Sequence, residues 1–176
     1  MTGKTAMTEM EAARATFDAA VTAARTTDDA FAALQVLAEA VVGAKLFTVM
    51  TVDMAAGVAR RAFSSDPVNY PVSGTKPIVR DAWFIGVSEK RQPFVANTLA
   101  DISLVFPDHA LIGRLGCGAV INLPVFIDDI FVATVNLLHE EHYYSADRVI
   151  RATSRLIPAG ADVIRHAAGL RGQTRP

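Results

Sequence analysis

Hydrophobic and polar positions divide the chain into a few elements, the clearest being two apolar runs on either side of an acidic pair. Residues 119–126 and 130–139 are rich in Val, Ile, Leu and Phe, and Asp128 and Asp129 lie between them. β-Branched and aromatic residues favour strands, whereas an Asp pair tolerates the backbone angles of a turn. Neither run alternates cleanly between apolar and polar residues, so we expect both faces to be covered. The pattern predicts a central antiparallel hairpin.

Apolar residues recur every three or four positions at both ends of the chain. This spacing predicts an amphipathic helix over about residues 8–24, and a second helix that Thr27 or Asp28 can cap and Gly43 ends. Ser145 can cap a last helix in the same way. Residues 45–54 and 58–64 predict an additional hairpin between the early helices and the middle of the chain.

The middle of the chain is irregular. Residues 66–77 hold three prolines and a glycine, which predicts a loop. A short helix from Asp81 to Lys90, a strand over 93–96 and two helical segments near 100–106 and 109–115 are expected to follow it.

The order of these elements predicts an α+β fold. Strands joined as hairpins indicate one antiparallel sheet, and the helices at the two chain ends are expected to cover one of its faces. Short helices and loops from residues 66–115 then cover the other face. Ligand cavities often form where irregular segments meet a sheet, so we expect a pocket under this second cover.

Composition narrows the possible partners. The chain has 176 residues, which fits one domain, and its net charge is −1 without a long run of either sign. We therefore expect neither a nucleic-acid nor a membrane partner. One cysteine cannot form an internal disulfide, and residues 1–10 lack the apolar segment of a signal peptide, which predicts a cytoplasmic protein.

Residues 28–168 resemble a GAF domain, a small-molecule sensor fold related to PAS domains. The resemblance lies in the late hairpin, GCGAVINLPVFIDDIFVATVNLLHE, and in Tyr144-Ser145-Ala146-Asp147 at the start of the last helix. Ala133 replaces the usual glycine of the second strand. The resemblance implies ligand binding but identifies no ligand or cofactor, because GAF domains bind cyclic nucleotides, bilins, haem, amino acids or nothing. Residues 1–27 then form an N-terminal helix for dimerisation or packing, and 169–176 a frayed tail.

Three polar residues interrupt the two central strands. Alternation along a strand places Asn122 on one face of its strand and Thr134 and Asn136 on one face of the partner strand. A buried amide without a partner costs about 1 to 3 kcal/mol, so these groups must meet the backbone, each other, water or a ligand. We place them in the pocket. The other candidate ligand-binding residues are Tyr70, Trp83, Phe84, Phe94, His109 and Cys117.

His109 follows Pro107 and Asp108 before the central hairpin. In phytochrome-type GAF domains, a Pro-x-His at a similar place contacts the bilin, and His109 matches that position. No cysteine lies beside His109, so bilin attachment is not expected; a surface or capping role is the alternative for this histidine. The histidines are not spaced as metal ligands, and no metal site is predicted.

Cys117 is the one candidate for chemistry, since the sequence contains no catalytic triad and no phosphate-binding glycine loop. It is either a reactive thiol or a small packed residue. We predict a non-catalytic sensory module that acts through homodimerisation or an output partner protein. Two alternatives stay open. One is a thiol-dependent redox enzyme of the GAF-type methionine sulfoxide reductase kind, dependent on an external thiol. The other is a structural dimer without a ligand, whose interior would be collapsed with Asn122 and Asn136 bonded to each other.

Overall fold

The computed structural model describes residues 2–173, with side chains from residue 7 to 170. Its helical elements are α1 (Thr2–Ala23), α2 (Thr27–Val41), α3 (Ala82–Phe84), the π-helical turn η1 (Ile85–Glu89), α4 (Leu99–Ser103), α5 (His109–Arg114) and α6 (Ala146–Gln173). Its strands are β1 (Leu46–Asp53), β2 (Val58–Ser64), β3 (Lys76–Pro77), β4 (Phe94–Ala96), β5 (Ala119–Ile127) and β6 (Ile130–His139).

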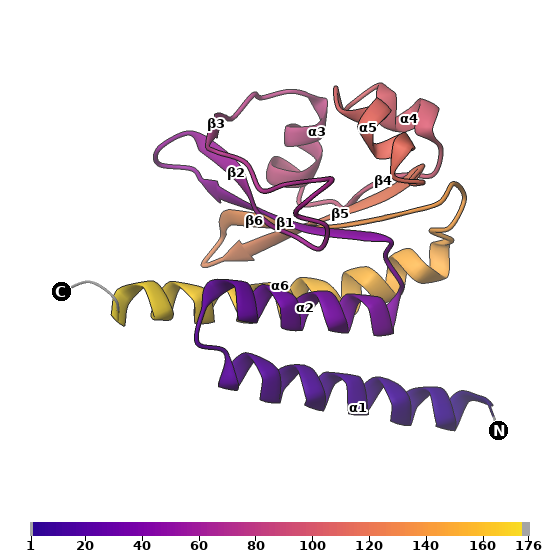
Figure 1. The fold of residues 1–176 in the computed structure, drawn as a ribbon, viewed down its shortest axis with the longest axis vertical. Coiled ribbons are helices and arrows are strands. Elements are labelled where there is room, and N and C mark those ends of the chain that lie inside the picture. Colours follow the sequence, from indigo (N-terminus) through magenta and orange to yellow (C-terminus); the bar gives the residue numbers. More distant parts are fainter. Residues whose placement is uncertain (1, 174–176) are drawn as a thin grey trace.

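The molecule is built in layers around one antiparallel sheet (Figure 1). The six strands are ordered β3-β2-β1-β6-β5-β4. Helices α2 and α6 lie against one face, α1 lies outside α2, and the short helices α3, η1, α4 and α5 with their connecting loops lie over the other face (Figure 1). This arrangement confirms the α+β fold class and the two different covers.

The central hairpin is confirmed in detail. β6 pairs with β1 on one side and β5 on the other, and Asn122 lies directly opposite Asn136. Asp128 and Asp129 have φ angles of 49° and 64°, the left-handed values that a two-residue hairpin turn requires.

The helix-side face of the sheet forms the main hydrophobic core. Gly160 of α6 lets this helix lie close to the sheet, because an added Cβ would be 3.0 Å from Val125 and 3.1 Å from Val135. The largest fully buried side chains of this core are Phe31, Leu34, Phe47, Val49, Ile121, Leu123, Val125, Leu137, Tyr144 and Leu156. Burying each aliphatic side chain contributes about 1.5 to 3 kcal/mol, so this layer fixes the position of the sheet.

Helix ends differ from the sequence prediction at several places, and α1 begins at Thr2 rather than near residue 8. The N-cap of α2 is Thr26, one residue before the predicted caps, because its hydroxyl accepts from the Asp29 N–H while the Asp29 carboxylate accepts from the Thr26 N–H. α6 extends to Gln173, so residues 169–173 are helical where the sequence predicts a frayed tail. Residues of high helix propensity around Gly169 offset the low helix propensity of this glycine. The rest of that tail, 174–176, lies outside the described residues.

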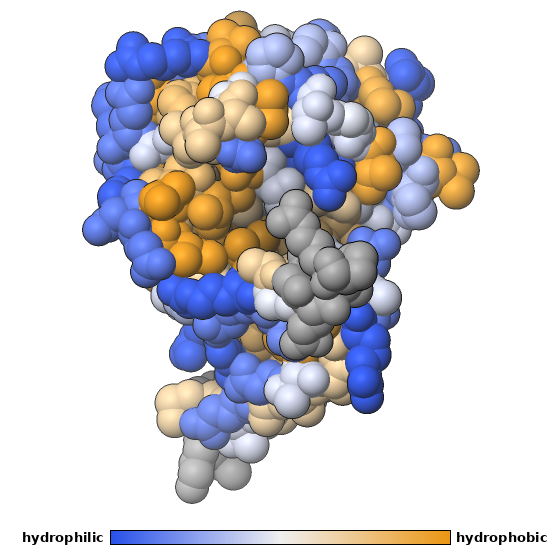
Figure 2. Space-filling view, turned by 90° about the vertical axis from the view of Figure 1, so that its left-hand side faces the viewer, coloured by the Kyte–Doolittle hydropathy of each residue, from blue (hydrophilic) through white to orange (hydrophobic). Residues whose placement is uncertain are grey.

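The surface of the molecule combines hydrophobic and hydrophilic areas. Viewed from the side on which β2 and β3 lie, hydrophobic side chains gather in a hollow that hydrophilic residues border on the left and below (Figure 2). No helix between residues 2 and 173 combines the length and the apolar composition that crossing a membrane requires.

Candidate functional site

A cavity of about 370 Å³ lies between the sheet and its irregular cover. The strands supply the floor through residues on one face of β1, β5 and β6, and the cover supplies mostly aromatic walls. The floor residues are Thr48, Met50, Val52, Val120, Asn122, Phe131, Thr134, Asn136 and Leu138, and the cover contributes Tyr70, Ile78, Trp83, Phe84, Phe106, Asp108 and Ile112, among others.

A chain of four polar side chains crosses the floor. The Trp83 indole N–H donates to Asn122 Oδ1 at 2.9 Å, Asn122 Nδ2 donates to Asn136 Oδ1 at 2.8 Å, and Asn136 Nδ2 donates to Thr48 Oγ1 at 3.2 Å. Sheet register accounts for most of this ladder, because Asn136 lies opposite Asn122 on β5 and opposite Thr48 on β1. The two buried amides therefore meet each other, which is one of the options that the sequence leaves open.

Thr134 is the exception to this pairing. Its hydroxyl is the one buried side-chain oxygen or nitrogen without a hydrogen-bond partner in the part of the chain that the structure describes. The residue is 0% exposed and belongs to the cavity lining. Unpartnered buried hydroxyl groups are uncommon because each loses its bonds to water.

Charged groups lie toward the β2 side of the cavity, where Arg61, Tyr70 and Asp108 form a latch. The Tyr70 hydroxyl donates to Asp108 Oδ2 at 2.6 Å, and the Arg61 guanidinium lies 3.6 Å from the Tyr70 ring and 3.5 Å from Asp108 Oδ2. Arg61 also donates to the Pro71 carbonyl at 2.8 Å. Burial, and then the bond to Asp108, raise the pKa of the Tyr70 hydroxyl, so it stays a donor at neutral pH. The latch joins the 66–77 loop to β2 and to the start of α5.

Six of the nine candidate residues lie in the cavity lining. They are Tyr70, Trp83, Phe84, Asn122, Thr134 and Asn136. Phe94, His109 and Cys117 do not belong to the lining.

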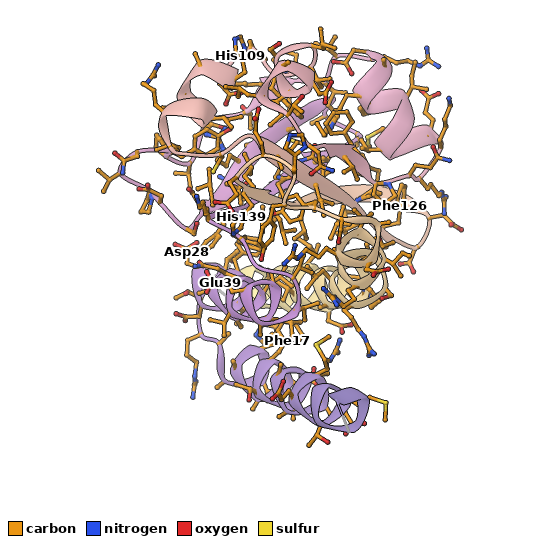
Figure 3. All side chains as sticks on the ribbon, turned by 90° about the vertical axis from the view of Figure 1, so that its right-hand side faces the viewer. Phe17, Asp28, Glu39, His109, Phe126 and His139 are labelled. Atoms are coloured by element: carbon orange, nitrogen blue, oxygen red, sulfur yellow. The ribbon has the colours of Figure 1, made fainter. Side chains whose placement is uncertain are left out.

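Each of these three residues has a different neighbourhood. The Phe94 ring packs on Phe106 at 5.7 Å between centroids. His109 lies at the outer side of the cover, away from the sheet (Figure 3), and its Nδ1 is 3.0 Å from the Phe106 carbonyl oxygen. Cys117 is 4% exposed in a cluster with Leu46 and Ile102, and burial raises the pKa of its thiol. His109 was a candidate for the pocket because its position resembles that of the bilin-contacting histidine, and the structure leaves it outside the cavity lining.

Sequence reasoning missed Arg61 and Asp108. The sequence prediction placed Arg61 only within the hairpin strand 58–64, but its side chain turns to the cavity face because Arg61 pairs with Met50. The pairing of β2 with β1 was the signal that could have identified Arg61 as a cavity residue. The described residues contain no group of three or more His, Cys, Asp or Glu side chains arranged to hold a metal ion.

This architecture is the fold of a GAF domain. A GAF domain of a phosphoenolpyruvate-protein phosphotransferase from Coxiella burnetii superposes with a TM-score of 0.69 at 16% identity, covering 96% of this chain and 98% of that one. A GAF domain of a two-component sensor histidine kinase from Bacillus halodurans gives 0.67 at 13% identity, over 85% of this chain and 100% of that one. Free methionine-R-sulfoxide reductase from Neisseria meningitidis gives 0.61 at 15% identity, over 90% and 87%. No family model matches the sequence, and no curated protein matches it.

Proposed function

We propose that the protein binds a small molecule in the cavity and acts as a non-catalytic sensory module. The open cavity carries this proposal. The ligand-free alternative requires a collapsed interior together with a bond between Asn122 and Asn136. The bond is present at 2.8 Å, but a space of about 370 Å³ remains above it. Aromatic walls over a polar floor are typical of small-molecule sites.

The cover supplies a means of response. The 66–77 loop meets the sheet and α5 through the Arg61–Tyr70–Asp108 latch, so a ligand that contacts these residues can favour one arrangement of the cover. The terminal helices then provide a homodimer contact, and an output protein partner in the cytoplasm reads the change. A two-component sensor kinase among the proteins of similar fold supports a sensory role.

Trp83 provides a direct test, because it is the single tryptophan and lines the cavity. A metabolite panel is screened by thermal stabilisation and by Trp83 fluorescence, and a ligand is expected to change both. Ala59→Leu fills part of the cavity and should weaken binding; Val58→Leu, one residue earlier on the opposite face of β2, should not. A panel without any stabilising compound contradicts the proposal.

The redox-enzyme alternative depends on Cys117, and the surroundings of this residue disfavour it. The thiol is buried outside the cavity lining, and its pKa is raised, so it holds little of the nucleophilic thiolate at neutral pH. Iodoacetamide should label native Cys117 at least about tenfold more slowly than the urea-unfolded chain. Equal labelling rates in the two states would restore the thiol enzyme as a candidate.

A further inference from the structure

We infer that the cavity selects a flat, uncharged molecule with a carboxamide-like edge, and that the Thr134 hydroxyl recognises this edge. The inference rests on the proposed ligand-binding function and specifies the chemical class of the ligand. Thr134 carries it. The Thr134 hydroxyl is buried, lines the cavity and has no partner among the described residues, so it can still donate one hydrogen bond and accept others.

The groups around Thr134 are neutral and leave mixed hydrogen-bonding capacity. Asn136, two residues along β6 on the same face, uses one amide hydrogen for Thr48 and one lone pair of its oxygen for Asn122. A second amide hydrogen and a second lone pair of Asn136 remain. A ligand edge that both donates and accepts, as a primary carboxamide or a lactam does, complements this pair of side chains.

A charged ligand end is disfavoured at the floor because the partially buried charges of the lining already have partners. Asp108 accepts from Tyr70 and pairs with Arg61, whose guanidinium also binds the Pro71 carbonyl. The exposed Asp81 carboxylate accepts from the Phe84 N–H at 2.8 Å. Arg60 and Lys76 are exposed to solvent. A carboxylate placed on Thr134 would lose its hydration without gaining a cation.

The walls specify the rest of the ligand. Trp83, Phe84, Phe106 and Phe131 present aromatic rings to the cavity, which favours a flat apolar body. Met50 lies directly opposite Thr134 in the β1–β6 pair and also lines the cavity. Its flexible thioether side chain can move aside to admit the ligand edge to the hydroxyl.

Benzamide and benzoate form a matched pair of probes for this inference. The single indole N–H resonance of Trp83 in a proton–nitrogen correlation spectrum reports binding beside Asn122. At neutral pH, benzamide should bind the intact chain at least about tenfold more tightly than benzoate, which is charged. Equal affinities, tighter binding of benzoate, or no shift with either probe would overturn the inference.

Variants at Thr134 separate recognition from structure. Thr134→Val should weaken benzamide binding about fivefold, the effect of one neutral hydrogen bond, and Thr134→Ser should restore it. Thr134→Val should not lower the melting temperature of the ligand-free protein, because the lost hydroxyl has no partner. Thr51→Val is the control, since Thr51 lies on the opposite face of β1. Unchanged benzamide affinity in Thr134→Val would contradict the role of this hydroxyl.

The metabolite panel keeps the two proposals apart. If a panel ligand binds in the cavity but the probes show no preference for the amide, the inferred chemical class of the ligand is wrong and the proposed function still holds. A panel without any ligand contradicts the proposed function itself.

Discussion

At the scale of single residues, the floor of the cavity combines a satisfied polar network with one unsatisfied group. Asn122 and Asn136 are 5% and 9% exposed, so each must be bonded within the protein to offset its lost hydration. The ladder from Trp83 to Thr48 meets this need. Removal of one member leaves its partner buried and unpaired, so removal of both members of a pair should cost less than the sum of the two single removals.

A double-mutant cycle tests this coupling. Asn122→Ala and Asn136→Ala should each lower the free energy of unfolding by about 1 to 3 kcal/mol, and the double variant should fall short of their sum by about 1 kcal/mol. Urea unfolding measures all three. The control pairs Asn136→Ala with Asn69→Ala, an exposed asparagine on the 66–77 loop, and these effects should add. Additivity in the Asn122–Asn136 cycle would show that the amide bond contributes no coupling.

For these residues, strand alternation was the only signal in the sequence that predicted their place in the cavity. Alternation placed Asn122 and Asn136 on one face, and the register confirms it. The contact of Asn122 with Trp83 joins residues 39 positions apart, and no local pattern encodes where a short helix docks on a sheet. The latch residue Asp108 was missed for the same reason, because its partners come from β2 and a loop.

At the scale of elements, the joint between β6 and α6 is a stack of three side chains. The His139 and Tyr143 rings are parallel with centroids 3.4 Å apart, and the Arg148 guanidinium lies 4.0 Å from the Tyr143 ring. The Tyr143 hydroxyl donates to the Val42 carbonyl at 3.0 Å, and a Cβ on Gly43 would overlap this hydroxyl. The stack therefore fixes the junction between β6 and α6 against the end of α2.

This joint should make stability depend on pH. Partial burial lowers the pKa of His139 below 6.5, with Lys45 and Arg148 adding to the effect and Glu140 opposing it. The unfolded chain therefore binds a proton at a higher pH than the folded chain does. His139 contributes stability above pH 6.5, and this contribution is lost as pH falls from 6.5 through the lower pKa of the folded state.

Urea unfolding over this pH range measures the effect. His139→Phe, which keeps a ring on Tyr143, should reduce the loss of stability on acidification, whereas substitution of the exposed His142 by Asn should not. Asn suits position 142 because His142 has a φ of 62°. An unchanged pH slope in His139→Phe would exclude His139 as its source.

Element positions were largely predictable, because periodicity and turn residues are local signals. The hairpin 45–64, the short strand near 93–96 and the last helix all lie where they were predicted. β3 was missed: its two residues pair with Val58 and Ala59 from within a proline-rich loop, so only tertiary contact defines it.

At the scale of the whole molecule, α1 forms an outer layer that does not line the cavity. Phe17, 3% exposed, points from α1 toward the helical layer below the sheet (Figure 3), and Arg14 pairs with Asp162 of α6 at 2.9 Å. The remaining side of α1 is exposed and includes Ala12, Ala15 and Ala19. Small residues on an exposed helix face allow a second helix to approach closely.

Deletion of residues 1–24 tests whether this layer assembles the protein. The intact chain should sediment as a homodimer and the shortened chain as a monomer, because the deletion removes the exposed alanine face that we propose as the dimer contact. The shortened chain should melt at a lower temperature, since α2 loses the cover that Phe17 and Val21 supply. It should keep the Trp83 fluorescence and ligand response of the intact chain, because every residue that lines the cavity lies between positions 48 and 138.

A monomeric intact chain would exclude the dimer, and a dimeric shortened chain would move the contact to α2 or α6. Retained ligand response in a monomer would show that sensing belongs to the domain and that dimerisation serves only its output.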